Sequence, residues 1–190
     1  LNELVYDGLL TAKQYAPLAS SPNAYPKLAN AYIEYDPDEA NRLLDEAGYS
    51  EKDADGFRLW KDGSGETMTF VIEGTAQAGS VGDDAIQLIV KYYQDVGVKA
   101  SYQYFERSLY TEHFRANDTE FAFWGGDRTV LPLAPGAPIF RGTMIDRPWC
   151  PGWGIWYNSN ATDPVSEEPP EGHWIWDIWD IWAKIEVEPD

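Results

Sequence analysis

The chain has 190 residues, 44% of them hydrophobic and 15% aromatic, which is enough to form one globular domain. Fourteen basic residues against 32 acidic ones leave a formal net charge of −18, so nucleic acid and anionic membranes are excluded as expected partners. Cys150 is the only cysteine, and neither an internal disulfide nor a cysteine-based metal site nor a cofactor is expected. No apolar run approaches the roughly 20 residues of a membrane helix. No signal-like segment opens the sequence at Leu1, so an exported form would have lost its signal or carry it outside this sequence.

Residues 1–30 mix short apolar runs with three prolines, which predicts an extended entry segment. A helix with both ends marked follows. Asp36 is placed to cap it, Pro37 occupies its first position, Glu39 completes a capping box and Gly48 ends it. Its apolar face consists of Ala40, Leu43, Leu44 and Ala47.

The residues after this helix have the pattern of a hairpin. A turn at 53–56 precedes two strand-like runs, Phe57–Trp60 and Glu66–Ile72, with a glycine-rich connection between them. Asp53 and Asp55 raise the alternative of a calcium loop, but the further oxygen ligands of such a loop are missing and the chain runs directly into a strand. A turn stabilised by aspartate side chains is the favoured interpretation.

From residue 68 onward, strands and helices are predicted to alternate. A strand at Met68–Ile72 leads to a helix capped by Asp83 or Asp84, and Gly97 ends that helix. The apolar face of the helix is Ile86, Ile89, Val90 and Tyr93. Alternating side chains over 98–104 predict a second strand, Ser108 is placed to cap a second helix, and residues 120–124 return as a third strand. This order predicts parallel strands in one sheet with helices packed on it.

In open α/β sheets, ligands bind where the strands end, and three loops leave this sheet at that edge. They cover residues 73–80, 105–107 and 125–128. The third loop offers two glycines for close backbone approach, an aromatic ring before them, and an acid and a base after them. The candidate ligand-binding residues are Tyr104, Arg107, Trp124, Gly125, Gly126, Asp127 and Arg128. Structural roles compete with this hypothesis, since Trp124 also suits a core position and Asp127 with Arg128 a solvated ion pair.

The last third of the chain is expected to differ from the α/β core at 31–130. Residues 131–170 are rich in proline and tryptophan and are predicted to be irregular. Within residues 171–190 a terminal helix is predicted over Trp174–Ile185. Its inward face would be Ile175, Ile178, Trp179, Trp182 and Ile185. A helix with so apolar a face is expected to pack against a complementary surface, either in this chain or in a neighbour that is missing.

The ordered set of motifs resembles the extracytoplasmic solute-binding proteins of family 5, which serve ABC importers of peptides, nickel and oligosaccharides. The resemblance rests on the capped helix at 35–48, the Asp-Gly hairpin, the strand-helix-strand unit ending near Gly97, and the turn at 124–127. Family members are two-lobed clamps with a type II periplasmic-binding-protein fold. The resemblance implies an α/β chain, residues 1–190 forming part of one lobe, with a mixed sheet and flanking helices. It also implies an extracytoplasmic location, in the periplasm or as a membrane-anchored lipoprotein.

In peptide-binding relatives the turn supplies an acid that pairs with the peptide's amino terminus, and by motif match that acid is Asp127. This chain departs from the pattern immediately afterwards, where Arg128 stands in place of a second acid. Arg128 would weaken amine recognition, and the nine tryptophans suit stacking on sugar rings, so both oligopeptide and oligosaccharide remain as ligands. The implied partners are ABC permease subunits and the remaining lobe of the same protein.

Two other functions compete. An α/β-hydrolase-like esterase would use Ser80 as its nucleophile, within an Ala78–Gly82 sequence that approximates the nucleophile elbow. Several residues separate that sequence from the preceding strand, and His113 and His173 are the only histidines, which disfavours an enzyme. A free-standing carbohydrate-binding module would explain the tryptophans, but the alternation of strands and helices argues against an all-β sandwich.

Overall fold

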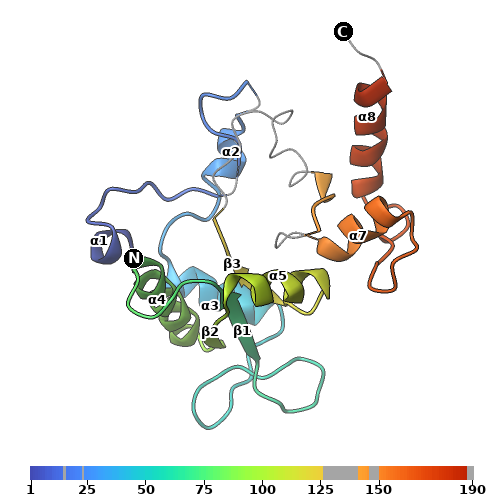
Figure 1. Cartoon of the computed structure of the whole chain (residues 1–190). Coiled ribbons are helices and arrows are strands. Elements are labelled where there is room, and N and C mark those ends of the chain that lie inside the picture. Colours follow the sequence, from blue (N-terminus) through green and yellow to red (C-terminus); the bar gives the residue numbers. More distant parts are fainter. Residues whose placement is uncertain (15, 23, 126–140, 146–149, 188–190) are drawn as a thin grey trace. The chain divides into compact units, whose positions relative to one another are not determined.

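The computed structural model describes residues 1–14, 16–22, 24–125, 141–145 and 150–187, without the side chains of residues 186 and 187. The chain divides into two compact units, whose elements are traced in Figure 1. Unit 1 consists of Leu1–Ala16, Tyr25–Glu106 and Glu120–Gly125. Unit 2 consists of Pro17–Ala24, Arg107–Thr119 and Gly126–Asp190.

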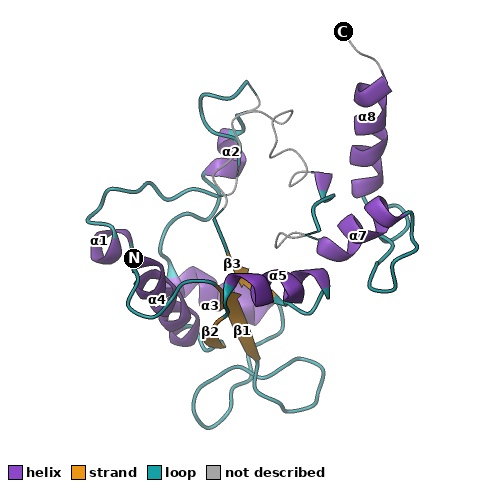
Figure 2. Cartoon of the chain, in the orientation of Figure 1, coloured by secondary structure: helices purple, strands orange, loops and turns teal. Residues whose placement is uncertain are grey.

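Unit 1 contains a three-stranded sheet with the order β2-β1-β3 (Figure 2). Its strands are β1 (Thr69–Gly74), β2 (Lys99–Tyr104) and β3 (Phe121–Phe123). Both β2 and β3 pair with β1 in parallel, so that Ile72 lies opposite Tyr102 on one side and Phe121 on the other. The predicted parallel α/β arrangement is confirmed. In the described residues, antiparallel pairing outside the sheet consists of two isolated bridges.

Helix α4 (Val81–Asp95) covers one face of this sheet (Figure 1). The buried centre of the contact is Ile72 of β1 with Ile86 and Val90 of α4. Partly buried side chains around it are Phe70, Ile89, Tyr93, Tyr102 and Phe123. The predicted apolar face of this helix is therefore confirmed. Burial of these side chains is the main stabilising contribution to unit 1.

The start of α4 differs from the prediction. Ser80 caps the helix, because its Oγ accepts a hydrogen bond from the Asp83 amide at 3.1 Å. Asp83 and Asp84 instead lie in the first turn, where negative charge interacts favourably with the helix dipole. The Asp83 carboxylate accepts a further hydrogen bond from the Gly79 amide at 2.9 Å. A serine and an aspartate three residues apart both suit the cap position, and only the backbone path selects between them.

Helix α3 (Pro37–Glu46) begins as predicted. Asp36 Oδ1 accepts from the Glu39 amide at 2.9 Å, and Pro37 occupies the first turn. The second half of the predicted capping box is wrong, because the Glu39 carboxylate pairs with Arg42, with Oε1 2.6 Å from Nη2. No residue of α3 is buried in the described structure, and Leu43 on its apolar face remains 37% exposed.

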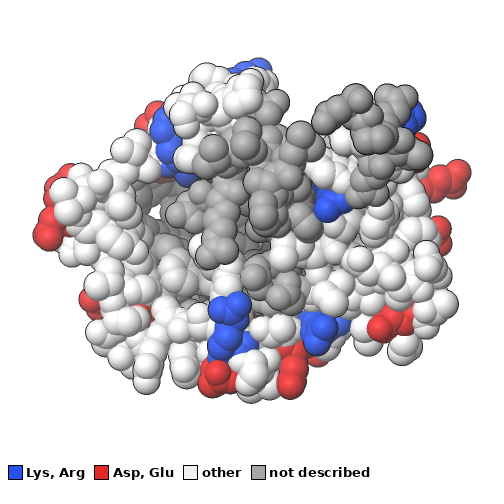
Figure 3. Space-filling model, turned by 45° about the horizontal axis from the view of Figure 1, so that its top comes forward, with Lys and Arg blue, Asp and Glu red and all other residues white. Residues whose placement is uncertain are grey.

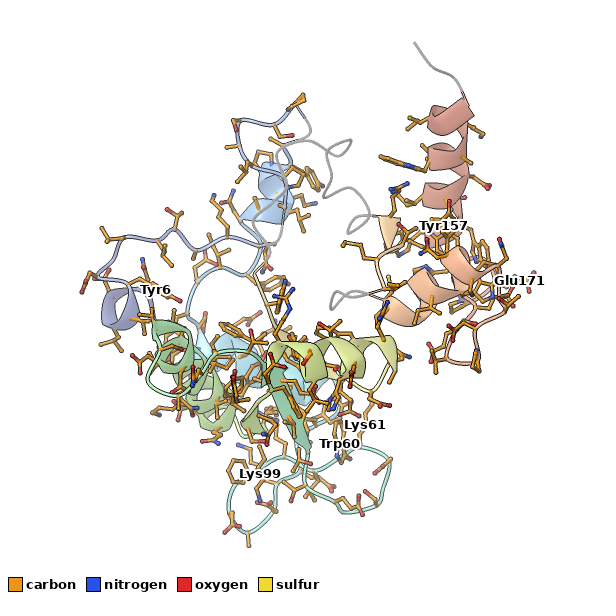
Figure 4. The ribbon with its side chains drawn as sticks, viewed as in Figure 1. Tyr6, Trp60, Lys61, Lys99, Tyr157 and Glu171 are labelled. Carbon is orange, nitrogen blue, oxygen red and sulfur yellow. The ribbon has the colours of Figure 1, made fainter. Side chains whose placement is uncertain are left out.

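The predicted hairpin over residues 57–72 forms only in part. Its two arms meet at a bridge between Leu59 and Thr67, and the Trp60 amide donates to the Glu66 carbonyl at 2.9 Å. Gly63 and Gly65 both have positive φ, so the connection curls and few backbone groups align across it. Beside the bridge, Lys61 Nζ lies 5.0 Å from the centre of the Tyr49 ring (Figure 4 labels Trp60 and Lys61).

The entry segment also contains regular structure. Two four-residue helices, α1 (Asn2–Val5) and α2 (Pro26–Ala29), interrupt the predicted extended segment. Pro26 sits at the start of α2, where its missing N–H costs nothing. The terminal ammonium of Leu1 donates to the Tyr92 hydroxyl at 2.9 Å, which ties α1 to α4.

Unit 2 contains the helices α5 (Arg107–Arg115), α7 (Pro151–Ser159) and α8 (Ile175–Val187). Helix α5 begins at Arg107, one residue before the serine predicted to cap it. Helix α7 lies inside the segment predicted to be irregular, where Pro151 starts the helix instead of preventing it. The predicted terminal helix is confirmed by α8.

Tryptophan rings of α7 and α8 pack together inside unit 2. Trp156 is stacked with Trp179 at 6.0 Å between ring centres, and Tyr157, labelled in Figure 4, lies 4.8 Å from Trp179. On the predicted inward face of α8, Ile175 and Trp179 are buried, but Ile185 is 46% exposed. The prediction is wrong at Ile185, because the packing side chains of α7 meet the first half of α8.

Among the described residues, none of the helices is both long and apolar enough to span a membrane. On the face drawn in Figure 3, the described acidic and basic side chains form small separate groups. The negative charge is therefore not gathered there into a single acidic surface.

Candidate ligand-binding edge of the sheet

The three strands of unit 1 end side by side. Gly74, the last residue of β1, lies opposite Tyr104 of β2 and Phe123 of β3. The Phe105 amide then donates to the Gly74 carbonyl at 2.9 Å, which extends the pairing one residue beyond β2. Because all three strands are parallel, their following loops leave from the same edge, as ligand-binding loops of open α/β sheets do. Trp124 and Gly125 follow β3 directly, so three predicted site residues, Tyr104, Trp124 and Gly125, belong to this edge.

The predicted site residues of the edge differ in exposure. Tyr104 is 42% exposed, Trp124 is half-buried and Gly125 is exposed. In the described part of the chain, no heavy atom lies within 4 Å of the point where a Gly125 Cβ would stand. Among the described residues, none obstructs the backbone at Gly125, whereas Trp124 is half-buried.

The other predicted site residues are not placed on this edge. Arg107 is the first residue of α5 and belongs to unit 2. Gly126, Asp127 and Arg128 lie outside the described residues. Their roles in ligand binding, including the pairing of Asp127 with a peptide amine, stay predictions.

Gly74 is glycine for a steric reason. A Cβ there would stand 3.1 Å from the Tyr102 ring and hydroxyl and 3.2 Å from the Phe123 Cβ. The two aromatic side chains thus flank the end of the central strand at contact distance. Alanine at this position would force one of them away from the edge.

Tyr102 of β2 also belongs to this edge, although it is not among the predicted site residues. Its hydroxyl accepts from the Ala76 amide at 2.8 Å and donates to the Ala76 carbonyl at 2.9 Å. Burial raises the pKa of the Tyr102 hydroxyl, so it remains the neutral donor at physiological pH. The signal in the sequence was a tyrosine within an alternating strand, because the hydroxyl of a partly buried tyrosine usually needs a hydrogen-bond partner.

The Asp53 carboxylate of the predicted turn at 53–56 is bonded within the protein. Asp53 Oδ2 accepts from Thr67 Oγ1 at 2.6 Å, and Oδ1 accepts from the Asp55 and Phe57 amides at 3.0 and 2.9 Å. The interpretation as an aspartate-stabilised turn is confirmed. Among the residues with described positions, no group of three or more His, Cys, Asp or Glu side chains could hold a metal ion.

Ser80, the alternative nucleophile, has a structural partner. Its hydroxyl oxygen caps α4 through the Asp83 amide, and both histidines belong to unit 2 whereas Ser80 belongs to unit 1. The parallel sheet also differs from the all-β sandwich expected of a free-standing carbohydrate-binding module.

Unit 2 contains a pocket that the sequence did not suggest. It has a volume of about 590 Å³ and lies before and at the start of α8. Glu168, Glu171 and Asp177 line it together with His173 and Trp176. The Trp153 ring packs edge-on against His173, with the ring centres 4.8 Å apart.

This edge lies within the part of the chain that matches a known protein family. Residues 1–139 match the family model described as bacterial extracellular solute-binding proteins, family 5 Middle. This chain belongs to that family. A comparison with curated proteins finds no match.

Solved structures resemble the whole chain. An oligopeptide-binding protein OppA is 32% identical with a TM-score of 0.79, and the match covers 100% of this chain and 30% of that one. The oligopeptide-binding protein AppA from Bacillus subtilis is 18% identical with a TM-score of 0.59, over 97% of this chain and 36% of that one. A periplasmic oligopeptide-binding protein from Thermotoga maritima is 21% identical with a TM-score of 0.59, over 94% and 32%.

Two facts about the fold follow. The chain spans about a third of the length of these solved proteins. Its α/β architecture is that of part of one lobe of a periplasmic binding protein, as the motif resemblance implied.

Proposed function

We propose that this chain is the part of a solute-binding protein that supplies one wall of a ligand site, and that the complete protein delivers an oligopeptide to an ABC importer. The observation that carries the proposal is the register of the sheet, which brings Gly74, Tyr104 and the Phe123–Trp124 step to one edge. Membership of the solute-binding family supports a binding role over a catalytic one.

An oligopeptide is the ligand that the comparisons favour. The OppA that is 32% identical is an oligopeptide-binding protein, and the solved AppA holds a nonapeptide. An oligosaccharide is the second candidate, because the Thermotoga maritima protein was solved with mannohexaose and because exposed aromatic rings such as Tyr104 suit sugar stacking.

We expect binding by clamp closure, because this chain represents part of one lobe and its relatives are about three times as long. Its edge would form one side of the site, and a second lobe would close over the ligand and exclude water. The closed form would then be recognised by permease subunits outside the membrane. The chain by itself is expected to bind weakly, because it offers half of the contacts and none of the free energy of closure.

A chimera tests this proposal. The matched 30% of the OppA chain is replaced by these 190 residues, and calorimetry measures a nonapeptide with a free amino terminus against its N-acetylated form. If Asp127 pairs with the amine, Asp127→Asn should weaken the free peptide about 10- to 100-fold, equivalent to a charge-assisted hydrogen bond, and leave the acetylated peptide unchanged.

Two results of the chimera experiment would redirect the proposal. Equal loss for both peptides would remove the amine-pairing role of Asp127. Binding of mannohexaose without binding of either peptide would select the oligosaccharide alternative.

The esterase alternative has its own test. Ser80→Ala should cost about 1 kcal/mol of stability through loss of the α4 cap and should leave any ester hydrolysis unchanged. Hydrolysis by the wild type that is abolished in this variant would support the enzyme instead. Ser80→Asp is the matched control, because aspartate keeps a capping oxygen but provides no hydroxyl nucleophile.

A further inference from the structure

The loop that leaves the central strand is fixed by one hydroxyl group. The Tyr102 hydroxyl bonds both backbone groups of Ala76, at 2.8 Å to the amide and 2.9 Å to the carbonyl, across 26 residues of sequence. These two bonds hold the first part of the 75–80 loop against β2. Gly74 leaves space for the Tyr102 ring to reach this position, because a Cβ there would stand 3.1 Å from the hydroxyl oxygen.

The second part of the same loop is closed by helix α4. The Asp83 carboxylate accepts from the Gly79 amide at 2.9 Å, and the Ser80 amide donates to the Gln77 carbonyl at 3.0 Å. Gln77, Ala78 and Gly79, which lie between Ala76 and Ser80, are exposed. The loop therefore presents a short exposed tip between two fixed ends.

We propose that Tyr102 is a positioning residue that holds the 75–80 loop as a ligand-contacting element of the sheet edge. The proposal rests on the proposed function, since it places the loop at the edge occupied by Tyr104 and Trp124. Its physical basis is preorganisation: a loop already fixed by Tyr102 does not lose conformational freedom when a ligand binds to its tip. Backbone amides and the Gln77 side chain at the tip suit the polar groups of a peptide main chain.

Tyr102→Phe removes the hydroxyl and keeps the ring, and Tyr93→Phe is the matched control. Tyr93 is another half-buried tyrosine that packs against the same core, 5.1 Å from the Phe70 ring. In the 190-residue chain, hydrogen exchange of the amides of Ala76 and Ser80 should become about tenfold faster in Tyr102→Phe, with unchanged exchange at Ile86 and Val90. Tyr93→Phe should leave the loop amides at their wild-type rates.

Two results would overturn the positioning role. Wild-type exchange rates in the loop of Tyr102→Phe would show that the hydroxyl does not hold it. Equal acceleration in the loop and in α4 would show that Tyr102 only stabilises unit 1 as a whole.

Ligand contact is tested by NMR titration of the same chain with a nonapeptide and, separately, with mannohexaose. The proposal expects amide shift changes at Gln77, Ala78 and Gly79 in the wild type, with affinity reduced about fivefold in Tyr102→Phe and unchanged in Tyr93→Phe. Shift changes at Tyr104 and Trp124 that spare the loop would overturn this proposal and leave the proposed function standing. Because the chain by itself is expected to bind weakly, both ligands are added at concentrations high enough to populate weak complexes, and the absence of shift changes at all of these residues would then overturn both proposals.

Discussion

Arg58 Nη1 lies 2.5 Å from Asp45 Oδ1, and the two side chains differ sharply in exposure, with Arg58 1% and Asp45 55% exposed. The guanidinium also donates to the Val96 carbonyl at 2.8 Å, to Asn41 Oδ1 at 2.7 Å and to the Tyr49 carbonyl. Arg58 thus joins α3 to the turn between α4 and β2. A buried cation is tolerated here because its donors reach acceptors on several sides.

Replacement of Arg58 should destabilise unit 1. Arg58→Met keeps much of the buried stem but leaves the carbonyl acceptors at Tyr49 and Val96 without their charged donor, and we expect a loss of about 3 kcal/mol in the free energy of unfolding. Urea unfolding followed by circular dichroism measures it. Asp45→Asn is the control and should cost less than about 1 kcal/mol, because its carboxylate is largely hydrated. Equal losses would show that the ion pair, and not the buried donors, carries the stability.

Gly97 should be sensitive to a single methyl group. Its φ is +84°, and a Cβ would stand 3.2 Å from both Arg58 Cγ and the Gly56 carbonyl oxygen. Gly97→Ala is expected to cost about 2 to 3 kcal/mol, from the left-handed backbone and from overpacking. Gly63→Ala has a similar φ of +79° and nothing within 4 Å among described atoms, so about 1 kcal/mol is expected there. Thermal unfolding of both variants compares the two costs, and an equal cost would exclude the steric contribution.

The turn at Asp53 should weaken in acid. The hydrogen bond from Thr67, with those from the Phe57 and Asp55 amides, lowers the pKa of Asp53 in the folded state. A lowered folded pKa stabilises the protein above the unfolded pKa of about 3.9, and this contribution is lost as the pH falls through the folded pKa. Asp53→Asn should therefore flatten the decline in the urea midpoint below about pH 4. Asp55→Asn, which leaves the Asp53 hydrogen bonds in place, should not, and a decline unchanged in Asp53→Asn would contradict the assignment.

Cys150 should react slowly despite its place at the start of α7. Burial raises the pKa of its thiol to about 12. Its raised pKa stabilises the fold below the unfolded pKa of about 8.5, and the contribution is lost as the pH rises toward the folded value. At about pH 8, iodoacetamide should modify the folded chain at least about a hundredfold more slowly than the urea-unfolded chain. Mass spectrometry follows the modification, and Cys150→Ser is the unreactive control. Similar rates in the folded and unfolded states would show that the Cys150 thiol is not protected by burial.

Local signals were sufficient for several elements of the α/β core. Asp36 caps α3 as predicted, the face of Ile86 and Val90 packs as its helical spacing required, and the alternation in β2 places Tyr102 on the covered face of the sheet. Each of these features depends on residues within a few positions of one another, where propensity and periodicity act directly. The motif order also identified the family.

Contacts between residues far apart in the sequence determined the features that local signals did not predict. Arg58 lies in a predicted strand of the hairpin, yet it is among the most buried side chains, because its partners include the Val96 carbonyl 38 residues away. The bond of Tyr102 to Ala76 likewise exists only once β1 and β2 pair in the observed register. Local sequence determined the helices and strands of the α/β core and the terminal helix, whereas α1, α2 and α7 were not predicted. The register and the positions of distant acceptors determined which polar side chains are buried and which loop is held at the edge, since hydrogen bonds between distant residues require the assembled backbone.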